Sequence, residues 1–195
     1  MIKLVSWDVD GTLFSYWQLA RTLIRLAPIT EWAWGELRET WRFHRLVEVQ
    51  RRSRNSRVYE EDLLIYASTY ALEKQAMQAA LSRMRPPENV QRALEGFERA
   101  GITQVALSDF ECDYKLRALG IERYFAKTYS CREFGYWKPS PIPLSKVQAE
   151  FGVRPQEHLH IGDRDDADGQ ACIQNGCKSA KPTVCTSALF AIINS

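Results

Sequence analysis

The 195-residue sequence lacks a hydrophobic run long enough to cross a membrane. The apolar run at 188–193 is among its longest, whereas a membrane-spanning helix needs about 20 apolar residues. A secretory signal is also missing, because Met1 leads directly into a strand-like segment that ends in aspartates. We therefore expect a soluble protein with no membrane partner.

Cysteines are few and follow no pairing pattern. Their number, five, is odd, and neither a CxxC pair nor a regular spacing occurs. This excludes a disulfide framework or a zinc site as the basis of the fold and favours reduced thiols and a cytoplasmic location. The cysteines are Cys112, Cys131, Cys172, Cys177 and Cys185.

An excess of one charge is missing as well. The chain has 26 Lys and Arg against 24 Asp and Glu, a net charge of +2, so no basic field indicates a nucleic-acid partner. The arginine-rich segment 51–57 lacks the interleaved aromatic residues on which bases stack, and we expect a solvated loop there. With 45% hydrophobic and 26% charged residues, the composition is typical of globular domains.

What the sequence does contain is an alternation of helical stretches and short apolar runs, often with glycine at the joint. Glycine just past a helix is a common stop signal, and Gly101, Gly120 and Gly152 each precede a β-branched residue. This alternation predicts an α/β fold, a Rossmann-like parallel sheet with helices on both faces. The expected strands cover 2–7, 102–107, 124–129, 158–161 and 178–181.

One long segment does not fit the alternation. From 15 to 86 we find three helical patterns and no convincing strand. We therefore expect an α/β core built from 1–14 and 87–195, with an all-helical insertion at 15–86. The insertion contains a single lysine, Lys74.

Acidic residues follow three of the expected strands. Asp8 and Asp10 come after the first, Ser108 and Asp109 end the second, and Asp163 follows the strand at 158–161 with Asp168 close behind. Ligand sites of open α/β sheets lie beyond the carboxyl ends of the strands. Clustered carboxylates repel one another, and a hard divalent cation such as Mg²⁺ relieves that repulsion.

Asp8 and Asp10 are two residues apart, so in extended backbone their side chains share one face. Two such carboxylates can divide the work of a reaction, one as nucleophile and the other as general acid and base. Gly11 would let the backbone approach a ligand closely. His158 and His160 share one side of a strand, and we expect a structural role for both.

The sequence resembles the haloacid dehalogenase-like superfamily in its phosphatase form. Asp8-Val9-Asp10-Gly11-Thr12 resembles the first motif, DxDGT, and Ser108 after an apolar strand resembles the second. Lys138-Pro139 is similar to the third motif and 162–168 to the fourth, GDxxxxD. The four motifs occur in the family's order, and the insertion after the first resembles the family's helical cap.

The resemblance implies a role for each matching residue. Asp8 would attack a phosphoryl group and form an aspartyl-phosphate, while Asp10 would protonate the leaving alcohol and then activate water. Ser108 would bind a phosphoryl oxygen, and Lys138 would balance the charge shared by Asp8 and the phosphate. Gly11 and Thr12 would complete the phosphate site.

Mg²⁺ would be held by Asp8, Asp163 and the backbone carbonyl of Asp10, with Asp168 close by. Asp165 and Asp166 compete with Asp168 for the role beside the metal, and the motif spacing favours Asp168. Asp109 is open to two interpretations. It would either contact phosphate or substrate, or cap the helix that follows.

The resemblance thus implies a Mg²⁺-dependent phosphatase for a small phosphomonoester, working through an aspartyl-phosphate. The alternatives are a dehalogenase or a phosphomutase on the same fold, and a catalytically weak binding or scaffold protein. Asp10 and the acidic fourth motif disfavour a dehalogenase. With only Lys74 in the insertion, a phosphonate-cleaving relative that needs a cap lysine is disfavoured too.

Overall fold

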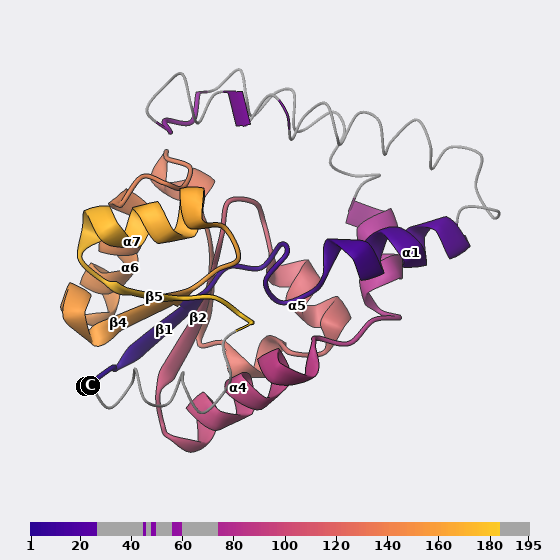
Figure 1. Ribbon diagram of the computed structural model, residues 1–195, viewed down its shortest axis with the longest axis horizontal. Coiled ribbons are helices and arrows are strands. Elements are labelled where there is room, and N and C mark those ends of the chain that lie inside the picture. The colour runs from indigo at the N-terminus through magenta and orange to yellow at the C-terminus, as the bar shows by residue number, and fades with distance from the viewer. Residues whose placement is uncertain (27–44, 46–47, 50–55, 60–73, 184–195) are drawn as a thin grey trace.

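The computed structural model describes residues 1–26, 45, 48–49, 56–59 and 74–183. These residues form a five-stranded parallel sheet of order β3-β2-β1-β4-β5, which confirms the predicted α/β fold (Figure 1). The strands are β1 Leu4–Trp7, β2 Thr103–Ser108, β3 Lys127–Ser130, β4 His158–Ile161 and β5 Lys178–Ala180.

Helices cover both faces of the sheet (Figure 1). Helices α4 (Glu88–Arg99) and α5 (Asp113–Leu119) pack on one face, and α6 (Ile142–Phe151) and α7 (Gln170–Asn175) pack on the other. Short helical turns complete the connections. They are η2 Glu122–Tyr124, η3 Cys131–Phe134, η4 Pro155–Glu157 and η5 Asp165–Gly169.

The side chains of β1 alternate between two hydrophobic cores, as the pleat of a strand requires. Val5 and Trp7 enter the core under α4 and α5, whereas Leu4 enters the core under α6 and α7. The Trp7 ring meets the Phe97 ring edge-on at 5.9 Å, and its Nε1–H donates to Gln104 Oε1 at 3.0 Å. The central strand is therefore buried on both sides, and it carries the site residues that follow it on a rigid base.

The expected strand at 124–129 begins later than the sequence suggested. Tyr124 belongs to the 3₁₀ turn η2, closed by the Phe125 N–H donating to the Glu122 carbonyl at 3.1 Å, and the strand starts at Lys127. The turn buries the Tyr124 ring in the core under α4 and α5. An apolar run does not distinguish a buried turn from a buried strand, which explains the error.

The predicted insertion is described only in part. Helix α1 (Tyr16–Leu26) and helical residues 74–81 lie in it, while 27–44, 46–47, 50–55 and 60–73 lie outside the described residues. The division into a core and an all-helical cap therefore stays a prediction. Across the described ranges we find no helix with the length and apolar character needed to cross a membrane.

The first residues of the chain are tied to the start of β4 through Glu157. Its carboxylate lies 2.8 Å from Lys3 Nζ, and it accepts the backbone N–H of Arg154 at 3.0 Å. Hydrogen bonds from Arg154 and Lys3 lower the pKa of Glu157 to about 2, from an ordinary 4.5. A carboxyl with a lowered pKa stabilises the fold above its unfolded pKa, and this contribution is lost as the pH falls through its folded pKa.

We predict that Glu157→Gln lowers the free energy of unfolding at pH 7 and that its deficit shrinks as the pH falls from about 4.5 toward 2. Urea unfolding of both proteins at several pH values measures the difference. The exposed Glu122→Gln serves as the control and should show no such convergence. A deficit for Glu157→Gln that stays constant down to pH 3 would contradict the prediction.

Candidate active site

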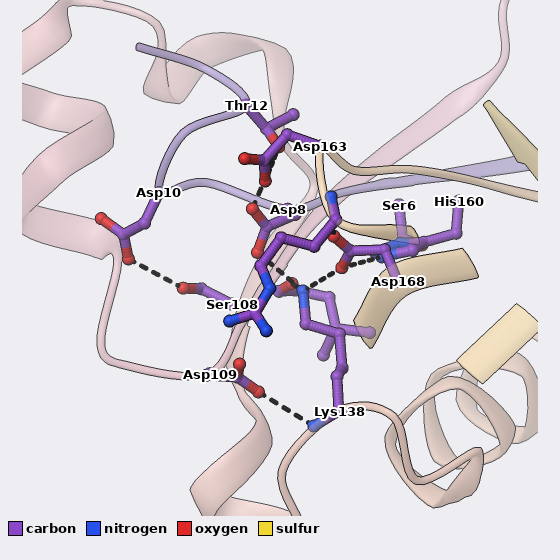
Figure 2. A network of polar contacts seen from close by, with 12 residues as sticks. Ser6, Asp8, Asp10, Thr12, Ser108, Asp109, Lys138, His160, Asp163 and Asp168 are labelled. Atoms are coloured by element: carbon purple, nitrogen blue, oxygen red, sulfur yellow. Dashed lines mark hydrogen bonds and ion pairs between the residues drawn. The ribbon is translucent and has the colours of Figure 1, made fainter. Parts of the chain in front are cut away.

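The carboxyl ends of β1, β2 and β4 bring their polar residues together at one edge of the sheet (Figure 2). They surround a small cavity of about 60 Å³. Seven of the residues predicted from the sequence line it: Asp8, Asp10, Ser108, Asp109, Lys138, Asp163 and Asp168. Tyr16, Phe110, Arg164 and Ala167 complete the lining, and the sequence had not singled these out for the site.

Lys138 is the cation at the centre of this group. Its Nζ lies 2.6 Å from Asp8 Oδ1 and 2.6 Å from Asp168 Oδ1, and 3.4 Å from the Leu107 carbonyl. Only 1% of the residue is exposed. The two ion pairs are therefore shielded from water. In such a buried place the attraction between opposite charges is strongest, and the loss of one partner is most costly.

Burial and charge set different proton affinities for these groups. Burial raises the pKa of the Asp8 carboxyl to about 7, although Lys138 pulls it the other way. Burial also opposes ionisation of Asp168, but Lys138 and His160 hold the pKa of that carboxyl well below its ordinary value. Asp168 and Asp8 outweigh burial at Lys138 and keep its pKa well above the usual range. The lysine is thus a permanent cation.

A second group joins Asp8 on its other side. The Thr12 hydroxyl lies 3.0 Å from Asp8 Oδ2 and 3.3 Å from Asp163 Oδ1 and can donate to either. Burial raises the pKa of Asp163. Carboxylate oxygens of Asp8, Asp163 and Asp168 all lie within 4.8 Å of one another.

Three carboxylates lie close together here, and Lys138 is the ammonium that contacts two of them, Asp8 and Asp168. One ammonium does not balance the charge of three ionised carboxylates. Burial is the main cause of the raised pKa of Asp8, and the neighbouring Asp168 carboxylate raises it further. Oxygen donors at this spacing suit a hard divalent cation such as Mg²⁺. The donor set therefore fits the predicted metal.

Asp10 faces a different cation from Asp8. Both of its carboxylate oxygens lie 2.6 Å from Lys115 Nζ, and the Ser108 hydroxyl donates to Asp10 Oδ2 at 3.3 Å. The strand itself ends at Trp7, before both residues. The two side chains reach the same cavity but pair with different lysines.

Lys115 is the functional candidate that sequence reasoning missed. It is buried on α5, with 4% of the residue exposed. A signal was available, because Cys112, Lys115, Leu116 and Leu119 follow the spacing of one buried helix face. A lysine inside an apolar stripe needs a partner anion, and here that partner is Asp10.

Asp109 does not cap the next helix, which was one of two interpretations of its position. Helix α5 begins after Cys112 and has no side-chain cap. The Asp109 carboxylate instead accepts the backbone N–H of Lys138 at 3.0 Å (Figure 2). It thereby anchors the loop that carries the central lysine. Contact with phosphate or substrate stays a prediction for this residue.

Glycines allow the loops to meet at this edge. Gly11 has φ +90°, and a Cβ there would lie 2.7 Å from Asp163 Oδ2. A Cβ on Gly162 would lie 2.2 Å from Asp168 Cγ. The backbone at Gly11 therefore approaches the Asp163 carboxylate, and that at Gly162 the Asp168 carboxylate, more closely than any other residue type permits.

The remaining acidic residues of the fourth motif point away from the cavity. Asp165 pairs with Lys181 and Asp166 with Arg164, and both aspartates are exposed. Arg164 lines the cavity, and its guanidinium also meets both carboxylate oxygens of Glu48, at 3.1 and 3.2 Å. This contact joins a described residue of the insertion to the site. Lys74 lies elsewhere, 3.7 Å from Glu111 and over the Tyr114 ring.

Comparison with known proteins agrees with this geometry. The family model for haloacid dehalogenase-like hydrolases matches residues 2–176. A glyceraldehyde 3-phosphate phosphatase of Methanopyrus kandleri is 30% identical over 186 residues, which cover 86% of this chain and 78% of that protein.

Solved structures share the fold. The putative HAD-hydrolase YfnB from Bacillus subtilis, in a form bound to magnesium, superposes with a TM-score of 0.70 at 14% identity, covering 100% of this chain and 99% of that one. L-2-haloacid dehalogenase from Xanthobacter autotrophicus gives a TM-score of 0.65 at 19% identity, covering 93% and 77%. The chain belongs to the haloacid dehalogenase-like hydrolases.

Proposed function

We propose that the protein is a Mg²⁺-dependent phosphatase that hydrolyses a small phosphomonoester. The observation that carries this proposal is the Asp8 carboxylate, which faces the cavity between a buried lysine and two further carboxylates. Phosphoryl transfer needs little from a protein beyond such positioning and charge neutralisation. The cavity of about 60 Å³ suits a phosphoryl group rather than a whole substrate.

In the first half of the reaction, an Asp8 oxygen attacks phosphorus while the bond from phosphorus to the substrate oxygen breaks. Asp10 gives its proton to the leaving alcohol. Lys138 stays within 2.6 Å of Asp8, so it offsets the negative charge that the phosphoryl group adds. The Ser108 hydroxyl, which also lines the cavity, would donate to a phosphoryl oxygen.

In the second half, water attacks the phosphorus of the aspartyl-phosphate and Asp10 takes the proton from that water. Phosphate leaves, and Asp8 returns as a carboxylate. The ion pair with Lys115 suits this half, because it holds Asp10 in place as the anion that accepts a proton. The proton that Asp10 gives to the leaving alcohol in the first half is thus replaced in the second half by the proton taken from the attacking water.

Asp8, Asp163 and the backbone carbonyl of Asp10 would hold Mg²⁺, with Asp168 beside them. Bound there, Mg²⁺ supplies positive charge to the phosphoryl oxygens during the transfer. Asp168 has its own donors in Lys138, His160 and the Arg164 N–H. Those donors hold the Asp168 side chain at the edge of the metal site.

The substrate proposal rests on the curated relative and on the rim of the cavity. The Methanopyrus relative is named as a glyceraldehyde 3-phosphate phosphatase, so short sugar and polyol phosphates head the candidates. The rim residues Tyr16, Phe110 and Arg164 would meet the part of the substrate beyond the phosphate. We propose that this reaction runs in the cytoplasm and that the insertion 15–86 is the cap over the site.

We predict Mg²⁺-dependent release of phosphate from p-nitrophenyl phosphate and from glyceraldehyde 3-phosphate. Asp8→Asn should lower that release roughly a thousandfold or more, because the amide cannot form the aspartyl-phosphate. A colorimetric phosphate assay with and without Mg²⁺ measures both, and 2-chloropropionate is tested in parallel for chloride release. Turnover of the chloroacid, or of no compound by folded protein, would overturn the proposal.

We predict that Lys115→Met slows hydrolysis of glyceraldehyde 3-phosphate by about tenfold or more, because Asp10 then loses the cation that fixes it. Turnover of p-nitrophenyl phosphate should fall less, since its leaving group needs little help from an acid. Steady-state kinetics on both substrates measures the difference. Lys127→Met, at an exposed pair with Glu150, is the matched control, and a loss in Lys115→Met no larger than in this control would count against the role.

We predict that Gly11→Ala abolishes most activity, whereas Gly101→Ala does not. Both glycines have positive φ, 90° and 67°, so either alanine is strained by about 1–2 kcal/mol. Only the Gly11 substitution places a methyl group against Asp163, since nothing lies within 4 Å of a Cβ on Gly101. Similar melting temperatures with unequal phosphate release are expected, and equal activity in the two variants would refute the steric argument.

A further inference from the structure

A row of buried polar side chains leaves the back of the active site and runs through the core between the sheet and helices α6 and α7. Figure 2 shows its first members, Asp168, His160 and Ser6. We call this row the buried polar chain. Its buried members, in order from the site, are Asp168, His160, Ser6, His158 and Gln148, and the half-buried Asn175 ends it.

Each link in the buried polar chain is a short contact. His160 Nε2 lies 3.1 Å from Asp168 Oδ1, and Ser6 Oγ lies 2.7 Å from His160 Nδ1. The same Ser6 oxygen lies 2.7 Å from His158 Nε2. Gln148 Nε2 lies 3.0 Å from His158 Nδ1. The neighbouring strands β1 and β4 and helix α6 are joined in this way by side chains alone.

The burial of these groups sets them apart from ordinary surface polar contacts. Ser6, His158 and His160 are each 0% exposed, in a layer that otherwise holds apolar side chains such as Leu4 and Leu144. Buried polar pairs add little net stability, and apolar replacements of similar shape are often as stable. Hydrophobic packing therefore does not account for their presence.

The hydrogen bonds of the buried polar chain run in one direction, which is set by the groups at its two ends. Asp168 also accepts hydrogen bonds from Lys138 Nζ and from the Arg164 backbone N–H, as an ionised carboxylate does. The His160 nitrogen that faces it must therefore carry a hydrogen. His160 Nδ1 then accepts from the Ser6 hydroxyl, and Ser6 in turn accepts from the Nε2–H of His158. His158 Nδ1 is left to accept the amide N–H of Gln148.

Neutral imidazoles are consistent with this order. Burial lowers the pKa of His158 to about 3 and lowers that of His160 as well. At the outer end, the Gln148 amide donates to Asn175 Oδ1 at 2.6 Å, and Asn175 donates to the Ser145 hydroxyl at 2.9 Å. From Gln148 inward to His160, each donor therefore points toward Asp168.

We propose that the buried polar chain positions the Asp168 carboxylate for the metal, with His160 as the positioning residue that acts on it. The inference rests on the proposed Mg²⁺-dependent function, since it concerns the same site. His160 and Lys138 both meet Oδ1 of Asp168, and the Arg164 N–H meets Oδ2 at 3.1 Å. These donors set the rotation of the carboxylate. The Ser6 hydroxyl at Nδ1 keeps the His160 proton on Nε2, where it is one of these donors.

The test measures Mg²⁺ binding by calorimetry on the full-length protein without substrate, together with the melting temperature without metal. We expect His160→Leu to weaken Mg²⁺ binding roughly tenfold or more, as the loss of a residue that orients a ligand does elsewhere. His160→Gln should recover most of the affinity, because its amide N–H can still reach Asp168. Ser6→Ala should lower the Mg²⁺ affinity less than His160→Leu does. It removes the hydroxyl that fixes the His160 tautomer but leaves the imidazole beside Asp168.

Leu159→Val is the matched control. Leu159 is the neighbour of both histidines on β4, equally buried, but belongs to the core under α4 and α5. Leu159→Val should change the melting temperature, while its affinity for Mg²⁺ stays within about twofold of the wild-type value. Should His160→Leu fail to fold, the comparison of His160→Gln with Ser6→Ala decides.

The positioning role would be overturned if His160→Gln and Ser6→Ala both bound Mg²⁺ with wild-type affinity and any folded His160→Leu did so too. That outcome would leave the proposed function standing. A wild-type protein that binds no Mg²⁺ would overturn the proposed function, and this inference with it. A second readout needs neither metal nor substrate. Long-range ¹H–¹⁵N spectra should show both histidines protonated at Nε2, and a His160 protonated at Nδ1 would contradict the order of donors.

Discussion

The site depends on one buried ammonium group. Lys138 Nζ lies 2.6 Å from both Asp8 and Asp168, and carboxylate oxygens of Asp8, Asp163 and Asp168 lie within 4.8 Å of one another. Removing such charges from water is costly, and only close mutual pairing offsets that cost. The loop that carries Lys138 is fixed by Asp109, which accepts the lysine's own backbone N–H. Lys138 thus links Asp8 after β1, Asp168 of the fourth motif and, through Asp109, the end of β2.

The two faces of the sheet contribute to this site in different ways. Under α4 and α5 the core is apolar, and Trp7 and Phe97 hold the central strand firmly between its neighbours. Under α6 and α7 the core also contains Ser6, His158 and His160. One face therefore supplies rigidity, whereas the other connects the interior of the fold to Asp168. A parallel sheet permits this division, because alternate residues of each strand belong to opposite faces.

The fold class and the strands before the acidic residues could be predicted from the sequence, because each of those strands ends in a glycine or aspartate signal. The strand at 124–129 lacked such a signal, and a buried turn at Tyr124 was mistaken for its start. Motif order brought out Asp8, Asp163 and Lys138, whose side chains the structure places around one cavity. Lys115 and the path from His160 to Gln148 were missed, since both depend on side chains that meet only when distant segments pack. The helical spacing of Lys115 hinted at burial, but not at which anion it would meet.

Asp8 and Asp10 show how two like residues two positions apart acquire different chemistry. The strand ends before both, and their side chains line the same cavity but contact different cations. Asp8 pairs with Lys138 from a loop, and burial raises its pKa to about 7. Asp10 pairs with Lys115 from α5, and the Ser108 hydroxyl donates to it. A nucleophile and a proton carrier must not compete for one cation, because neutralising either would then depend on the state of the other. Separate lysines on separate elements remove that dependence.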